Sequence, residues 1–552
     1  MNRHGAALII GVTMLAGACT ADSDSPASVP HRSIECSETA SGFDAWAAAG
    51  FSGTIAISTG GMQDCSLAYG NTTDTVFSVG SITKSFTAAA VFALIDDGKL
   101  STEDRAGDLV PDLGGPVADA TVAQLLTHTS GLTGNHGSDE QPLGRDEALA
   151  AISKLGVAFA PGSDVLYSNA GYTLLALIIE ETSGMSYRDF MVTRVLTLPD
   201  GHIAGGFWDG NPAAPGPRAV GLLDDGSSGA TGDFAGPHWA LDGNGGLAMT
   251  TRDLASWTHA LFAGQVVSPD AVERISTPVF DVGEGRSETP GWVALNDTVF
   301  GEPGLAAAGG GDSTGHNAVV VWLPSSERVV AIASNTAKVT AEELLRAVGP
   351  ALVAGDPLPT PRDDEVALDS GALDAVVGRY ELDAGGSFEV SSRDARLVVT
   401  AAGTEAVTAL FPIPDDIGAS RVAEHEADVL ALLAGATDEG RDERKALETD
   451  IGTLDDVELA GTLFDDGELR TYVTVTSGNE TAVVWYALDE EGSVAAVEIT
   501  DRLPSRSFVS TTGGFRPDEP SASEPTIAFD DNRMTLSGPD GATTTTAARS
   551  AR

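Results

Sequence analysis

Two short apolar stretches around a Gly-Gly pair open the regular part of the chain, at residues 51–70. The stretch reads FSGTIAISTGGMQDCSLAYG, and a Gly-Gly pair between β-prone runs is typical of a hairpin. From residue 81 the pattern changes, because SITKSFTAAAVFALIDDG is apolar nearly all round and ends at Gly98. A helix of this kind belongs in a protein core. The sequence therefore predicts a hairpin followed by a buried helix.

Further helical patterns follow before strands return. Helices are predicted at 121–128, 171–184 and 250–264, and strands within 317–335. Strands at both ends of a segment with helices between them indicate an α/β domain whose sheet is closed by its two ends. We expect this domain to cover residues 41–354.

The composition and the pattern of apolar residues change after residue 354. The run GDPLPTPRDDEV, residues 355–366, is rich in proline and charge and is typical of a linker. Short alternating strands dominate beyond it, interrupted by helical patterns near 421–434 and 437–450. We predict a β-rich C-terminal domain over 367–552, a small barrel with an α/β insertion, and expect its last dozen residues to be disordered.

Residues 1–19 have the pattern of an export signal, with an early arginine and an apolar run too short to span a bilayer. Two interpretations compete. Ala16 and Ala18 fit ordinary secretory cleavage, whereas Cys19 directly after them resembles a bacterial lipoprotein box. We expect lipid attachment at Cys19, a tether over residues 20–40, and a location in the cell envelope with the lipid as the only membrane link.

Cys36 and Cys65 are the two cysteines that remain when Cys19 is set aside. In an oxidising, exported setting two cysteines more often pair than stay free, so we expect a disulfide between them. The alternative is a pair of buried thiols, because the sequence does not fix the geometry that a bond requires.

The charge balance limits the partners. The chain has 80 acidic and 31 basic residues and a net charge of −49, which argues against nucleic acid and anionic membrane surfaces as partners. Only five of the basic residues are lysines. One of them, Lys84, stands three residues after Ser81, where the buried helix begins.

Ser81 and Lys84 share one face of that helix, so the amine can reach the hydroxyl. Burial disfavours the ammonium form of a lysine, which can then act as a base, and N–H groups at a helix start stabilise a developing anion. The S-x-x-K spacing alone is a weak signal. Its place at the start of a core helix favours a function, because a buried lysine needs a partner.

Tyr167 and Asn169 lie in a predicted loop between a Pro-Gly turn and a buried helix. A phenol there can relay a proton, and a carboxamide can hold both a lysine and a substrate carbonyl. Taken alone, the simpler interpretation is a loop tyrosine and a capping asparagine.

Together these motifs resemble those of the serine hydrolases of the class C β-lactamase and D-alanyl-D-alanine carboxypeptidase family, the penicillin-binding protein-like enzymes. Those enzymes combine S-x-x-K, Y-x-N and a third K-T-G or H-x-G motif. The likeness extends over roughly residues 45–350 and includes TVAQLLTHTSGL, APGSDVLYSNAGYTLLALIIEETSGMSYRDF and GNGGLAMTTRDLASW. It implies an α/β fold of the β-lactamase/transpeptidase type, with an antiparallel sheet and a helical region.

The resemblance also implies roles for single residues. Ser81 would be the acylated nucleophile, Lys84 its activating partner, Tyr167 the proton relay to the leaving group, and Asn169 a ligand for substrate and lysine. His128 belongs to a segment that we expect to be structural. Together with His136 it lacks the third ligand and spacing of a metal site, so we expect no metal or other cofactor.

The third motif departs from the family pattern. Relatives read like H-G-G-G-x-x-G, and aligning the Gly-His pair at 315–316 with its end places Gly309 where the family has Lys or His. Gly311 is expected to allow close substrate approach. The Asp312 N–H is expected to complete the oxyanion hole with that of the nucleophile.

The missing basic side chain affects the expected substrate, because penicillins and D-Ala-D-Ala peptides carry a carboxylate that such a group would orient. We therefore expect a hydrolase of esters or amides, small-molecule or peptide, with weak β-lactamase or carboxypeptidase activity. The alternative is a catalytically impaired surface lipoprotein that acts as a binding protein. The four retained motif residues favour the enzyme.

Overall fold

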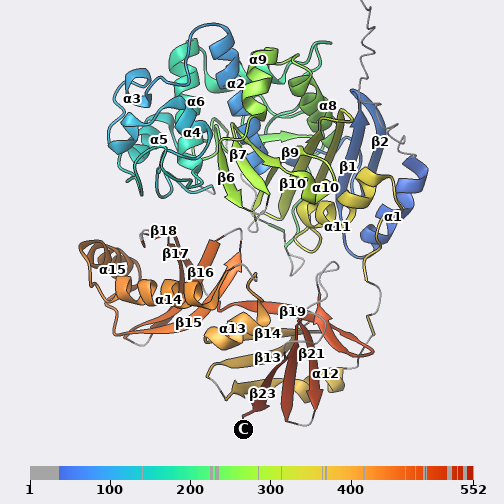
Figure 1. Cartoon of the computed structure of the whole chain (residues 1–552), viewed down its shortest axis with the longest axis vertical. Helices are drawn as coiled ribbons and strands as arrows, with labels where there is room; N and C mark the ends of the chain where they lie inside the picture. The colour runs from blue at the N-terminus through green and yellow to red at the C-terminus, as the bar shows by residue number, and fades with distance from the viewer. Residues whose placement is uncertain are drawn as a thin grey trace, which may run out of the picture. The chain divides into compact units, whose positions relative to one another are not determined.

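The computed structural model describes residues 36–550 (Figure 1), apart from gaps at 140, 224–227, 230–234, 284, 312–313, 363–364, 367, 369, 384, 394, 415–416, 466–467, 479, 489–491, 493, 501, 519–524, 531 and 539–543. The predicted export signal, the lipid site at Cys19 and the tether up to residue 35 lie outside the described residues. The tether prediction is wrong at its end, because helix α1 (Cys36–Ala48) begins there and buries Phe43 and Trp46.

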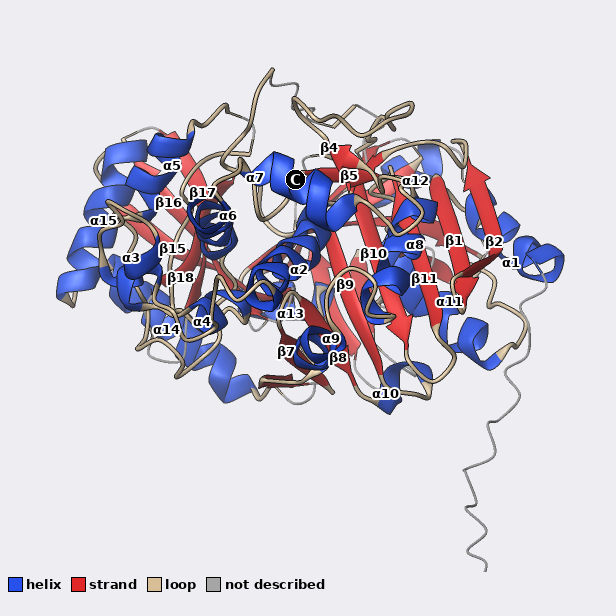
Figure 2. Ribbon diagram, turned by 90° about the horizontal axis from the view of Figure 1, so that it is seen from above, coloured by secondary structure: helices blue, strands red, loops and turns tan. Residues whose placement is uncertain are grey.

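Eight strands of the described chain form one antiparallel sheet in the first domain, in the order β2-β1-β11-β10-β9-β8-β7-β6 (Figure 2). They are β1 (Gly53–Thr59), β2 (Met62–Tyr69), β6 (Phe280–Gly283), β7 (Arg286–Thr289), β8 (Trp292–Leu295), β9 (Gly304–Gly311), β10 (His316–Leu323) and β11 (Arg328–Ser334). Gly53 of β1 pairs with Ser334 of β11. The predicted hairpin and the predicted closure of the sheet by its two ends are therefore confirmed.

Helices cover both faces of the sheet. On one face, α1 and α11 (Ala341–Ala354) bury apolar side chains such as Phe43 and Leu344 against Ile55 and Val319. On the other face lies α8 (Thr251–Phe262), whose Thr251 bonds to Thr54 of β1. The remaining elements of this domain are β3 (Phe77–Ser78), η1 (Gly80–Ile82), α2 (Thr83–Asp96), α3 (Ala106–Leu109), η2 (Pro116–Asp119), α4 (Val122–Leu126), α5 (Arg145–Ile152), α6 (Asn169–Ser183), α7 (Tyr187–Phe190), η3 (Met191–Leu196), β4 (Gly206–Phe207), β5 (Leu247–Met249), α9 (Pro269–Ser276) and α10 (Asp297–Phe300).

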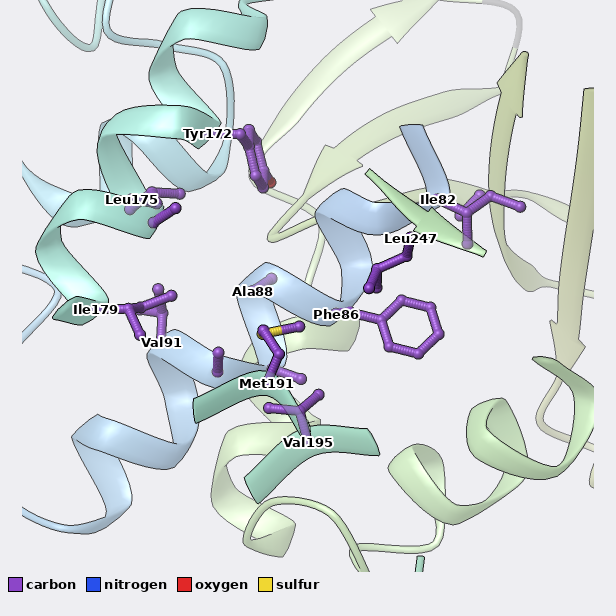
Figure 3. Packing of buried hydrophobic residues seen from close by; sticks show 14 of the residues in the cluster. Ile82, Phe86, Ala88, Val91, Tyr172, Leu175, Ile179, Met191, Val195 and Leu247 are labelled. Carbon is purple, nitrogen blue, oxygen red and sulfur yellow. The ribbon is translucent and has the colours of Figure 1, made fainter. Parts of the chain in front are cut away.

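Helix α2 is the buried helix that the sequence predicts. Residues 83–94 of it are all buried. Figure 3 shows Ala88 and Val91 of α2 facing Leu175 and Ile179 of α6, with Met191 beside them. Because each fully buried large apolar side chain contributes about 1.5–3 kcal/mol, this packing fixes the start of α2 firmly in place.

The predicted disulfide is present. Cys36 of α1 and Cys65 of β2 are bonded, with their Cα atoms 5.0 Å apart. The bond attaches the first helix to an edge strand of the sheet.

The C-terminal domain is a closed barrel with an insertion, as predicted. The barrel strands are β12 (Gly378–Leu382), β13 (Ser387–Arg393), β14 (Arg396–Ala402), β19 (Ser505–Thr511), β20 (Gly514–Pro517), β21 (Thr526–Asp530), β22 (Arg533–Ser537) and β23 (Thr544–Arg549), preceded by α12 (Ser370–Val376). The insertion holds α13 (Thr404–Leu410), α14 (Ala419–Leu433), α15 (Asp438–Ile451) and a sheet of β15 (Asp456–Asp465), β16 (Glu468–Ser477), β17 (Glu480–Leu488) and β18 (Val494–Thr500).

Where the structure describes the last dozen residues, the expected disorder is wrong. The Thr-rich run at 544–549 forms β23, which pairs with β12 and β22 and buries Ala547 in the barrel core. Threonine is favoured in strands, and this preference outweighs the polar character of the run. Within the described residues, no helix combines the length and the apolar character needed to span a bilayer.

Candidate active site

The predicted nucleophile and its lysine meet at the start of the buried helix. Ser81 lies in η1, and Lys84 lies in the first turn of α2. Lys84 Nζ and Ser81 Oγ lie 2.9 Å apart, within hydrogen-bond distance, as the i, i+3 spacing predicts. Ser81 is half-buried, whereas Lys84 is only 3% exposed.

Lys84 has two further partners, both of them carbonyl oxygens. Its Nζ donates to Asn169 Oδ1 over 2.8 Å and to the main-chain oxygen of Asn244 over 3.1 Å. Burial lowers the pKa of the Lys84 amine, and this effect outweighs the opposing influence of Tyr167. The Lys84 amine therefore loses its proton more readily than an ordinary lysine does.

Tyr167 completes the contacts of the nucleophile. Its hydroxyl donates to Ser81 Oγ over 2.6 Å, and its ring lies 4.6 Å from Lys84 Nζ. The side chain is 54% exposed, so the hydroxyl stands where solvent and a substrate can reach it. The structure brings together the four residues that the motifs predict.

His128 holds the tyrosine segment, as expected of a structural residue. Its Nδ1 accepts the Ser168 N–H over 3.1 Å, and its carbonyl accepts the Leu166 N–H over 2.8 Å. Its ring lies 4.5 Å from that of Tyr167. Burial lowers the pKa of His128 to about 3, so the imidazole is neutral with its proton on Nε2.

The other histidine considered, His136, bonds to the Trp239 carbonyl over 2.9 Å. No group of three or more metal-ligating side chains occurs among the described residues.

Asn169 is placed by the start of α6. Ser168 caps this helix by accepting the Gly171 N–H over 3.1 Å, and the first helical residue is Asn169 itself. The chain is extended at Ser168 and helical from Asn169, and the Asn169 side chain contacts Lys84 while the Tyr167 hydroxyl contacts Ser81.

The contact from Asn244 was not predicted. Asn244 belongs to the stretch GNGGLAMTT, which carries part of the family resemblance, but its oxygen is a main-chain atom. A main-chain contact depends on the path of the backbone. Every residue has a carbonyl oxygen, so the residue types in the sequence do not indicate such a contact. Only the neighbouring glycines, which favour a tight turn, hint at it.

The structure corrects the interpretation of Gly309. Strand β9 packs against η1, and a Cβ at residue 309 would lie 2.3 Å from Ser81 N and 2.4 Å from Val79 O. Neither lysine nor histidine fits there, so this position is not an empty place for the family's basic residue. Gly311 ends β9 and pairs with His316. Asp312 lies outside the described residues.

Comparison with known proteins identifies the family. The sequence model of the Beta-lactamase family matches residues 45–354, more than half of the chain. The chain therefore belongs to the β-lactamase and penicillin-binding protein-like family, a group of serine hydrolases.

Penicillin-binding protein 4* of Bacillus subtilis (strain 168) is 27% identical over 355 residues, which cover 60% of this chain and 77% of that protein. The octameric penicillin-binding protein homologue from Pyrococcus abyssi has a TM-score of 0.52 at 19% identity and covers 86% of this chain and 100% of its own. SurE has a TM-score of 0.51 at 21% identity, and the match covers 85% of this chain and 98% of the SurE chain. The two structures are similar to this chain in fold.

Proposed function

We propose that this protein is an exported serine hydrolase that forms an acyl-enzyme on Ser81 and acts on esters or amides. The observation that carries the proposal is the set of contacts around Ser81 Oγ, with Lys84 Nζ at 2.9 Å and Tyr167 OH at 2.6 Å. Export is supported by the pattern of residues 1–19 and by the Cys36–Cys65 disulfide, which is typical of oxidising compartments.

The contacts of Lys84 support its role as the base. A neutral amine has two N–H groups and one lone pair. The carbonyl oxygens of Asn169 and Asn244 take both N–H groups, which leaves the lone pair for the Ser81 hydroxyl proton.

The reaction then follows from the positions of these groups. Ser81 Oγ attacks the substrate carbonyl carbon while its proton passes to the Lys84 amine, and the carbonyl electron pair moves to oxygen. The Ser81 N–H, against which a side chain at residue 309 would collide, stabilises that oxyanion. When the carbonyl re-forms, the leaving group departs with the Tyr167 proton, which Lys84 replaces. Water repeats these steps to release the acid.

Strand β9 supports the preference for esters and amides. Its face toward η1 carries Ala307 and Gly309, and its described residues include no basic side chain. A substrate carboxylate therefore finds no cation on this strand. We accordingly place penicillins and D-Ala-D-Ala peptides among the weak substrates.

The test is mass spectrometry of the protein after exposure to a fluorophosphonate and, separately, to a penicillin. We expect a covalent adduct on Ser81, formed faster with the fluorophosphonate and lost in Ser81→Ala and Lys84→Ala. Ser78→Ala is the matched control, because Ser78 lies on β3, is also half-buried and should leave labelling intact. Absence of an adduct on the folded protein would favour a catalytically impaired, lipid-anchored binding protein.

A further inference from the structure

Arg188 and Asp242 form a buried ion pair in the helical region. Arg188 Nε lies 3.2 Å from both carboxylate oxygens of Asp242, and Nη2 lies 2.9 Å from Oδ1. The two side chains are 6% and 1% exposed. Arg188 also donates to the Asp209 carbonyl and lies 4.2 Å from the Phe207 ring. The arginine thus clamps the carboxylate from a fixed position.

The residues at and after Asp242 present three consecutive carbonyl groups to neighbouring helices. Thr173 Oγ1 donates to Asp242 O over 2.9 Å, Thr87 Oγ1 to Gly243 O over 2.7 Å, and Lys84 Nζ to Asn244 O over 3.1 Å. The clamped carboxylate therefore lies two residues from the oxygen that contacts the catalytic amine.

The turn at residues 242–244 has little conformational freedom. Gly243 has a φ of +97°, and a Cβ there would lie 2.4 Å from Tyr172 O. The Asn244 side chain donates to Thr173 Oγ1 and to the Ala240 carbonyl. A displacement of Asp242 would therefore move the Asn244 carbonyl as well.

A contribution to folding stability alone does not explain this ion pair well. Burial raises the pKa of Asp242 to about 6, although Arg188 opposes this, and Glu180 and Asp209 add to the rise. Removing two charges from water often costs more than their attraction returns, so apolar replacements of such pairs are frequently neutral or stabilising. A positioning role accounts for the pair better than a stabilising one.

We propose that the Arg188–Asp242 pair is a positioning element of the active site, which keeps the Asn244 carbonyl on Lys84 and so directs the lone pair of the amine at Ser81. The inference deepens the proposed function and rests on it for the rate of acylation. The state of Lys84 itself can be measured without turnover.

The test compares single and double variants. Arg188→Met or Asp242→Leu leaves one charge buried without its partner and should lower the melting temperature. The double variant Arg188→Met/Asp242→Leu removes both charges and should regain most of it. Arg194→Met is the matched control, because Arg194 pairs with Asp97 at the surface, at 3.0 Å.

We expect the double variant to react with a fluorophosphonate about 10- to 100-fold more slowly than wild type, the loss typical of a misplaced catalytic group. Asp242→Asn, which retains an oxygen for Arg188, should keep more of the rate than Asp242→Leu. The control should match wild type in rate and in melting temperature.

The second readout is the titration of Lys84, followed by NMR with lysine labelled at Cε. The chain has five lysines, so the spectrum is simple, and Lys84→Met assigns the signal. We expect the pKa of Lys84 to fall in the double variant, because its ammonium form loses an acceptor.

A double variant that folds, reacts at the wild-type rate and keeps the Lys84 titration unchanged would overturn the proposal. If the double variant does not fold, unchanged rate and titration in folded Asp242→Leu would do the same. A wild type that fails to react, with Lys84 still shifted in the double variant, would instead refute the proposed function and leave the positioning role standing.

Discussion

At the scale of the residue, the site depends on one buried amine with fully assigned contacts. Lys84 is held by Ser81, Asn169 and Asn244, and Tyr167 meets the same serine from the solvent side. A hydroxyl that two groups contact can lose its proton on one side while a leaving group gains one on the other.

Tyr167→Phe tests the second contact. The ring should still pack on His128, but the hydroxyl that donates to Ser81 is gone. We expect turnover of an ester substrate to fall about 10²- to 10⁴-fold, the usual contribution of general acid–base catalysis. The melting temperature should stay within a degree or two, because the side chain is 54% exposed. Steady-state kinetics with scanning calorimetry measures both, and full activity in the variant would exclude the relay role.

Glu288 gives a prediction about pH. Burial raises the pKa of this β7 carboxyl from 4.5 to about 7, against the opposing effect of Arg286. The folded state therefore binds the proton more tightly than the unfolded state, so this group lowers stability as pH rises from about 4.5 through 7.

Glu288→Gln removes that titration. The melting temperature of the variant relative to wild type should rise between about pH 5 and pH 8. Glu103→Gln, at an exposed position of the same domain, serves as control and should show a constant difference. A constant difference for Glu288→Gln as well would contradict the pKa shift.

At the scale of the element, the contact of β9 with η1 shapes the site. Gly309 lets the strand lie directly against the backbone of Gly80 and Ser81. Close backbone approach is a common reason for glycine in a strand, and here a side chain at residue 309 would collide with the backbone N of Ser81.

Gly309→Ala should therefore separate the strand from η1. Overpacking of this kind typically costs about 1–3 kcal/mol, and we expect a lower free energy of unfolding together with loss of acylation. Gly309→Lys should fail in the same way and should not create penicillin hydrolysis. Gly236→Ala is the control, because a Cβ there meets no atom within 4 Å. Chemical denaturation and adduct formation check both effects, and a stable, active Gly309→Ala would show that β9 has room to move.

The elements were predictable where pattern and packing agree. The buried α2, the capped α6 and the hairpin of β1 and β2 follow from local sequence, and the motif residues at their ends follow from the family resemblance. The contact of the Asn244 carbonyl with Lys84 and the Arg188–Asp242 ion pair could not be predicted from the sequence, because they depend on where distant segments meet. The alignment of Gly309 with the family's basic residue was wrong, because counting along a glycine-rich stretch does not show which atoms a side chain at that position would meet.

At the scale of the whole molecule, the main feature is the large negative net charge. With a net charge of −49, acidic groups repel one another across the surface, and salt screens this repulsion, with a Debye length of about 10 Å at 0.1 M.

The melting temperature near pH 7 should therefore rise by several degrees between about 0.02 M and 0.5 M NaCl. The same comparison close to the sequence pI of 4.2 is the control, because the net charge there is small and the rise should largely vanish. A fall in melting temperature with salt near pH 7 would mean that attractive ion pairs outweigh the repulsion.

The closure of the sheet by its two ends has a consequence for biosynthesis. The strand β1 pairs with β11, which follows about 280 residues later in the chain. At about 5–20 residues per second, the ribosome needs roughly 15–55 s to reach that partner. Until then Ile55 and Ile57, buried in the finished sheet, remain exposed on an unpaired strand edge. The nascent domain therefore carries an open pairing edge for most of its own synthesis, a surface of the kind that chaperones protect.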